Sequence, residues 1–129
     1  HNLAMDSQGR LFVADRLNYR IQIFDQVGNL LDVWKQFGQP SGLYIDDKDV
    51  LYVADSHSWG PNNRGWRKGI RIGSARDGTI EYFIADLEST THANSGAEGV
   101  TADAQGNVYG GVVRRRSPRP RHCRPASML

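Results

Sequence analysis

The chain has 129 residues, 39% of them hydrophobic, which is the size and composition of one ordinary globular domain. No stretch approaches the roughly 20 apolar residues of a membrane-spanning helix, so we predict no membrane span. The formal charge of +2 divides unevenly, because residues 1–113 hold 10 Lys and Arg against 14 Asp and Glu, a balance of −4, whereas residues 114–129 hold six arginines and no acid.

The first 34 residues predict four short strands joined by turns. Residues 1–5 form an apolar strand, and residues 11–15 alternate after a turn at 6–9. Asp6 opens that turn, where its carboxylate can accept a backbone N–H, and Gly9 closes it where φ is positive. Residues 20–24 alternate again and residues 30–34 follow a second turn. The pattern is that of an antiparallel sheet.

The motif of residues 1–15 recurs at residues 41–55 and 98–112, at spacings of 40 and then 57 residues. Asp49 takes the place of the turn glycine in the second copy. Strands at residues 69–73 and 79–83 complete the second unit. Four antiparallel strands in a repeat of about 40 residues are typical of a β-propeller blade, which buries its faces only against other blades.

We therefore predict an all-β fold, a β-propeller fragment of about three four-stranded antiparallel blades. The expected blades are residues 1–40, residues 41–97 with an insertion at 56–69, and a partial blade at 98–113. Residues 114–129 form a basic tail that we expect to be disordered or artefactual, because its prolines interrupt the third strand. The tail lacks aromatic residues, so nucleic acid is not an expected partner. Apolar positions such as Leu3 and Leu43 are expected to fill the space between sheets.

The first unit resembles the NHL repeat, through Val13-Ala-Asp15, Asn18, Arg20-Ile-Gln-Ile-Phe24 and the turn at Gly28. The resemblance covers residues 1 to about 113. It implies a six-bladed propeller and a chain about twice this length for closure.

A narrower resemblance is to the propeller of the peptidyl-α-hydroxyglycine α-amidating lyase family. His1-Asn-Leu-Ala4 is similar to the family segment that begins with a zinc histidine, and Arg16 falls at an active-site arginine of that family. Glu98 stands where the family has its next histidine, which departs from an all-histidine zinc site. Glutamate oxygen binds zinc or calcium, so the resemblance still implies a metal held by His1 and Glu98. It also implies an extracytoplasmic or secreted protein; the residues themselves leave the compartment undetermined.

In a propeller the inner strand of each blade starts near the central channel, so His1, Ser41 and Glu98 occupy equivalent positions around one end. These residues either hold a metal or cap strands in a water-filled channel. Arg16, at the end of a second strand, is the candidate catalytic residue, because arginine beside a metal can orient a substrate carboxylate.

The insertion carries Trp59, Arg64 and Trp66, with Arg67 and Lys68 nearby, and has no strand periodicity. These side chains either bind an anionic ligand over the channel or form a lid that buries its own tryptophans.

Two functions follow. One is a metal-dependent lyase or hydrolase in the complete ring. The alternative is a non-catalytic platform that binds a small molecule or peptide at the central channel, or a protein on its loop face. We also expect this fragment to self-associate through its exposed end faces.

Overall fold

The computed structural model describes residues 1–87 and 96–113, in which all regular structure other than two short 3-10 turns is β-strand. The predicted all-β class is confirmed. The strands form antiparallel sheets of four, four and two strands, as a propeller fragment requires. The described residues contain no helix long and apolar enough to cross a membrane. The prediction for the tail falls on residues 114–129, which lie outside the described residues.

The first sheet has the order β1-β2-β3-β4 and the second has the order β5-β6-β7-β8. The bounds of the first sheet are β1 (Leu3–Met5), β2 (Leu11–Asp15), β3 (Arg20–Phe24) and β4 (Leu30–Trp34), with η1 (Arg16–Asn18) after β2. Those of the second are β5 (Pro40–Ile45), β6 (Val50–Asp55), β7 (Gly69–Ser74) and β8 (Ile80–Ala85), with η2 (Gly60–Asn62) after β6. The third sheet pairs β9 (Ala97–Ala102) with β10 (Val108–Val112).

The turns between the first two strands of each sheet follow the predicted chemistry. Asp6 accepts hydrogen bonds from the backbone N–H groups of Gln8 and Arg10, at 3.0 and 2.8 Å. Asp46 and Asp103 do the same two and four residues ahead of themselves. Gly9 has φ 77° and Asp49, in the equivalent place, has φ 60°. Each carboxylate therefore fixes the hairpin that sets the register of its sheet.

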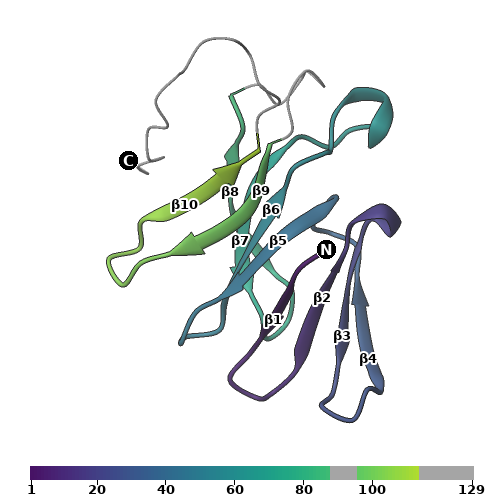
Figure 1. Cartoon of the computed structure of the whole chain (residues 1–129), viewed down its shortest axis with the longest axis vertical. Helices are drawn as coiled ribbons and strands as arrows, with labels where there is room; N and C mark the ends of the chain where they lie inside the picture. The colour runs from purple at the N-terminus through teal and green to yellow at the C-terminus, as the bar shows by residue number, and fades with distance from the viewer. Residues whose placement is uncertain (88–95, 114–129) are drawn as a thin grey trace.

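The three sheets lie side by side, with the second sheet between the other two (Figure 1). The layer between the first two sheets contains Phe12, Ile21, Ile23 and Trp34 against Leu43, Leu51 and Val53. The layer between the last two contains Tyr52, Ala54, Ile70 and Ile72 against Ala97 and Val108. The second sheet is thus covered on both faces, which is how a propeller blade is stabilised.

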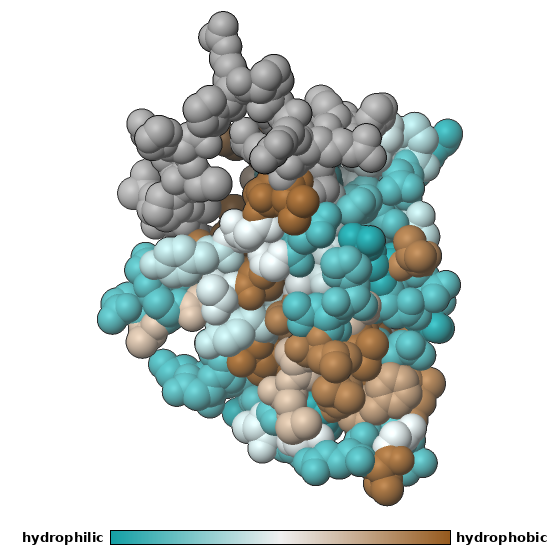
Figure 2. All heavy atoms as spheres, in the orientation of Figure 1, coloured by the Kyte–Doolittle hydropathy of each residue, from teal (hydrophilic) through white to brown (hydrophobic). Residues whose placement is uncertain are grey.

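The outer face of the first sheet lacks such a cover among the described residues. Leu3 is 61% exposed, whereas Leu43, at the same place in the repeat, is 5% exposed. The expectation that Leu3 belongs to the core is wrong for this chain, because the described residues supply no sheet against the face that carries Leu3. Figure 2 shows apolar side chains gathered in the lower part of the view, where β1–β4 lie in Figure 1.

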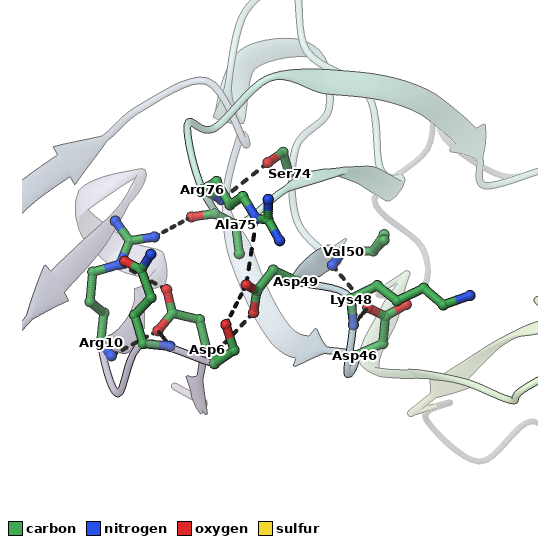
Figure 3. A network of polar contacts seen from close by, with 11 residues as sticks. Asp6, Arg10, Asp46, Lys48, Asp49, Val50, Ser74, Ala75 and Arg76 are labelled. Carbon is green, nitrogen blue, oxygen red and sulfur yellow. Dashed lines mark hydrogen bonds and ion pairs between the residues drawn. The ribbon is translucent and has the colours of Figure 1, made fainter.

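Polar contacts also join the first two sheets, at the end where their hairpin turns meet (Figure 3). The Arg10 guanidinium, paired with Asp6 at 2.7 Å, donates to the carbonyl oxygen of Ala75 at 2.8 Å. Asp49 accepts from Ser7 of the first sheet. These contacts fix the second sheet against the first at the end opposite the one where the candidate functional residues lie.

Candidate functional site at one end of the three sheets

The inner strands of the second and third sheets each begin with a β-bulge. In β5, Pro40 pairs with Asp55 and Gly42 pairs with Ala54, so Ser41 is the extra residue. In β9, Ala97 pairs with Val112 and Gly99 pairs with Gly111, so the extra residue is Glu98. Ser41 and Glu98 hold the same position in the sequence repeat. A bulge changes the direction of a side chain at the end of a strand, and such bulges are frequent beside active sites.

The bulged ends of β5 and β9 lie close together. A Cβ at Gly42 would lie 2.6 Å from the carbonyl oxygen of Glu98, so only glycine permits this approach. The backbone N–H of Gly96 donates to the carbonyl oxygen of Ser56 at 2.9 Å. The third sheet therefore starts directly against the loop that follows β6.

A chain of hydrogen bonds runs through this end of the second sheet. The Ser41 hydroxyl is buried and lies 2.5 Å from the Ser56 hydroxyl, which in turn lies 2.5 Å from Nδ1 of His57. On the other side of Ser41, its carbonyl oxygen lies 3.2 Å from Nδ1 of His1. Because a carbonyl oxygen only accepts, His1 Nδ1–H is the donor, and Nε2 of a neutral His1 keeps its lone pair.

Arg16 enters the same region from the first sheet. It opens η1 immediately after β2, and the Tyr19 hydroxyl of this loop donates to the carbonyl oxygen of Asn62 in the insertion at 2.9 Å. Arg16 is half-buried, and within the described residues its guanidinium makes no hydrogen bond or ion pair. We call His1, Arg16, Ser41, Ser56, His57 and Glu98 the channel-end cluster.

Burial and the charged groups of the channel-end cluster shift the pKa of His57. Burial lowers the pKa of the imidazole below its ordinary value, and the positive charge of Arg16 lowers the pKa further. Glu98 and Asp55 act in the opposite direction, whereas Lys68 acts in the same direction as Arg16. Arg16 and Glu98 thus influence one side chain although they stand on different sheets.

A buried ion pair holds the loop that carries His57. The Asp55 carboxylate accepts from Arg71 Nη1 at 2.9 Å and from the backbone N–H groups of His57 and Ser58 at 3.3 and 2.9 Å. The Arg71 guanidinium lies 4.7 Å from the ring centroid of Trp66 and 4.6 Å from that of Phe83. Desolvation lowers the pKa of Arg71, and Asp55 counteracts that shift. This arrangement fixes both ends of the insertion.

The first sheet has a more exposed version of the same pair. Asp15, equivalent to Asp55, binds Arg20 Nε at 2.7 Å, and these two residues are register partners. In the second sheet the register partner of Asp55 is Gly69, and the arginine lies two residues farther along β7. That shift brings Arg71 under Trp66 and Phe83, where it is 6% exposed.

The predicted ligand-binding residues of the insertion differ in their surroundings. Trp59 is half-buried at the start of η2, Arg64 is exposed, and Trp66 packs on Arg71. Lys68 is 1% exposed. Trp66 therefore has a place within the fold, and ligand binding by Trp59, Arg64 and Trp66 stays a prediction.

Ser56 and His57 were not predicted as site residues. A usable signal was present, because aligning the two motif copies places Asp55-Ser56-His57 over Asp15-Arg16-Leu17. The position next to the candidate arginine is thus a histidine in the second unit.

His1 and Glu98 suit a metal in the chemistry of their donor atoms. Metal-binding histidines commonly donate their other ring N–H to a carbonyl oxygen, as His1 does to Ser41. However, within residues 1–87 and 96–113 no three His, Cys, Asp or Glu side chains lie close enough to hold an ion. A metal at this end would need donors besides those described.

Comparison with known proteins points to the same repeat. No family model matches the chain. A segment of 59 residues is 41% identical to NHL repeat-containing protein 3 of Homo sapiens, and it covers 42% of this chain and 17% of the human protein. The matched segment is thus less than a fifth of that relative's length. Together with the sequence repeat and the antiparallel sheets, this similarity supports NHL-type repeats.

Proposed function

We propose that the chain is part of an NHL-type propeller that serves as a binding platform, and that the ligand is a small molecule or peptide held by the channel-end cluster. The observation that carries the proposal is the pair of bulges at Ser41 and Glu98, which occupy equivalent repeat positions on neighbouring sheets. Bulges at matching positions keep a polar end on each inner strand while the rest of the strand packs in the core.

The surroundings of the cluster make it suitable for binding. The Tyr19–Asn62 hydrogen bond joins the loops that carry Arg16 and His57. The Asp55–Arg71 ion pair holds the second of these loops in place. Loops fixed in this way lose little backbone freedom when a ligand binds, which favours affinity.

A ligand screen of the full-length protein tests the platform. Saturation-transfer NMR against amino acids, small carboxylates and short peptides is expected to identify a binder whose signal is lost in the Arg16→Gln/Glu98→Gln variant. The matched control, Lys35→Gln/Glu81→Gln, removes the same charges at exposed positions outside the cluster and should retain binding. Binders that persist in the cluster variant, or no binder at all, would refute the proposal.

A second candidate is the metal-dependent lyase, which is favoured by the hydrogen bond from His1 Nδ1 to Ser41. His1 and Glu98 would contribute to holding zinc or calcium, and Arg16 would orient the substrate. Bound metal would supply polarisation of a substrate oxygen or an activated water.

Elemental analysis of the full-length protein tests this candidate. His1→Ala and Glu98→Ala should each lower the metal content without unfolding the protein. Unchanged stoichiometry, or no metal in the wild type, would eliminate it.

A further inference from the structure

Two opposite charges stand in the channel-end cluster without partners. Within the described residues, neither Arg16 nor Glu98 forms a side-chain hydrogen bond or an ion pair, either with the other or with a neighbour. Both residues are half-buried. Partly buried charges are costly unless they are paired, so this arrangement favours a ligand that supplies the partners.

The topology keeps the two charges in one region but on different supports. Arg16 belongs to the loop after β2, which Tyr19 ties to the insertion. Glu98 is the bulge residue of β9, two residues from Gly96, which is hydrogen-bonded to Ser56. His57 follows Ser56 directly, and the charges of both Arg16 and Glu98 act on its ring.

His57 is equipped for either role in a hydrogen bond. Its Nδ1 is occupied by Ser56, which leaves Nε2 for a ligand. In the chain Ser41–Ser56–His57 every hydroxyl can donate or accept. If the hydroxyls point toward Nδ1, Nε2 carries the proton and donates; if they point away, Nε2 accepts. The neutral imidazole can therefore contact a polar ligand of either kind.

We propose that the channel-end cluster binds a zwitterion of the amino-acid type, with its carboxylate on Arg16, its ammonium group on Glu98, and His57 Nε2 hydrogen-bonded between them. The guanidinium presents two parallel N–H donors that match a carboxylate, and the Glu98 carboxylate accepts from ammonium. This inference rests on the proposed binding platform, and it specifies the ligand class for that site.

Calorimetric titration of the full-length protein tests the ligand class. The probes are glycine, β-alanine, 4-aminobutyrate and 5-aminovalerate, which separate the two charges by increasing distances, with acetate and methylammonium as single-charge controls. At least one zwitterion is expected to bind about tenfold or more tightly than either control, which corresponds to about 1.4 kcal/mol.

Variants separate this ligand class from the alternatives. Arg16→Gln and Glu98→Gln should each reduce the affinity of the preferred zwitterion by about tenfold or more, and Lys35→Gln should not change it. Thermal melts confirm that each variant is folded. If acetate binds as tightly as the zwitterions and Glu98→Gln strengthens binding, the site is an anion site and the inference is wrong.

The failure of this inference is distinguishable from failure of the platform. If no zwitterionic probe binds but a ligand from the NMR screen still depends on Arg16 and Glu98, the platform stands and the zwitterion class is overturned. If the screened ligands are also insensitive to the two substitutions, both proposals are overturned.

Discussion

Asp49 of the second sheet accepts two hydrogen bonds from Ser7 of the first sheet, from the backbone N–H at 2.8 Å and from the hydroxyl at 2.6 Å. Asp49 adopts φ 60°, a conformation that favours glycine, which stands at the equivalent place in the other two units. Figure 3 shows the same carboxylate beside Arg76, with Nε and a carboxylate oxygen 3.6 Å apart. Asp49 therefore adopts a backbone conformation that is less favourable for aspartate than for glycine, and its side chain joins two blades. We call this contact between Asp49 and Ser7 the clasp.

Asp49→Gly is expected to destabilise the full-length protein, although it relieves the positive φ. The lost hydrogen bonds include two to a charged acceptor, which outweigh the backbone gain. Ser7→Ala removes the hydroxyl bond alone and should cost about 1 kcal/mol. The midpoint of urea denaturation measures both effects. Asp47→Gly, at an exposed position in the same turn, is the control. A midpoint for Asp49→Gly equal to that of the control would contradict the clasp.

The clasp should weaken in acid. The Ser7 hydroxyl and backbone N–H lower the pKa of Asp49 below its ordinary value, with a smaller effect from Arg76. A carboxyl group with a lowered folded-state pKa adds stability that is present above the unfolded pKa of about 3.9 and is lost as pH falls through the folded value. The difference in urea midpoint between wild type and Asp49→Gly should therefore narrow below about pH 4. A constant difference from pH 7 to pH 2 would argue against ionisation as its source.

Arg71→Leu is expected to cost about 3–5 kcal/mol of folding stability, because it leaves the fully buried Asp55 carboxylate without its counter-ion. It also removes the group that contacts the rings of Trp66 and Phe83. Adding Asp55→Asn should recover part of the loss, since the uncompensated charge disappears. Arg64→Leu, at an exposed position, is the control. Denaturant titration of the full-length protein measures both variants. If Arg71→Leu costs no more folding stability than Arg64→Leu, the Asp55–Arg71 ion pair does not stabilise the fold.

The 129-residue chain on its own is expected to self-associate through the open face of the first sheet. Leu3 and Met5 are 61% and 53% exposed there, at positions equivalent to Leu43 and Ile45 in the covered second sheet. Leu3→Lys/Met5→Lys should shift sedimentation toward the monomer. The control variant, Leu17→Lys/Val27→Lys, alters residues that are 79% and 86% exposed but lie outside the strands. It should leave the sedimentation unchanged. A monomeric wild-type chain with a sharp cooperative melt would be decisive against this view.

The sequence was sufficient to predict features set by neighbouring residues. The Asp-initiated turns, the strands and the unusual place of Asp49 all followed from local chemistry. What it did not reveal depends on residues far apart in the chain, such as the reach of Asp49 to Ser7 and the burial of Arg71. The alternation of apolar residues predicts which side chains share a face of a strand, but not whether another sheet covers that face. The core prediction for Leu3 therefore fails, because Leu3 is exposed.

Part of the candidate site was within reach of sequence analysis and part was not. Repeat alignment brought His1, Ser41 and Glu98 to equivalent positions, and the bulges at Ser41 and Glu98 show that the equivalence extends to backbone geometry. The serine–histidine chain depends on Ser56 turning toward Ser41 across β5 and β6. No periodicity in the sequence indicates such a contact.

The titration of His57 provides the last test, since it reports on the whole channel-end cluster. Burial and then Arg16 lower its pKa, so the folded protein binds its proton less readily than the unfolded chain. Folding stability should consequently fall as pH decreases below the unfolded pKa of about 6.5. NMR of the imidazole nitrogens in the full-length protein should give a midpoint below that value. Arg16→Gln should raise the midpoint and Glu98→Gln should lower it, whereas Lys35→Gln should leave it unchanged. A midpoint at or above the ordinary histidine value, or one insensitive to Arg16→Gln, would show that Arg16 and His57 do not share the environment described for them.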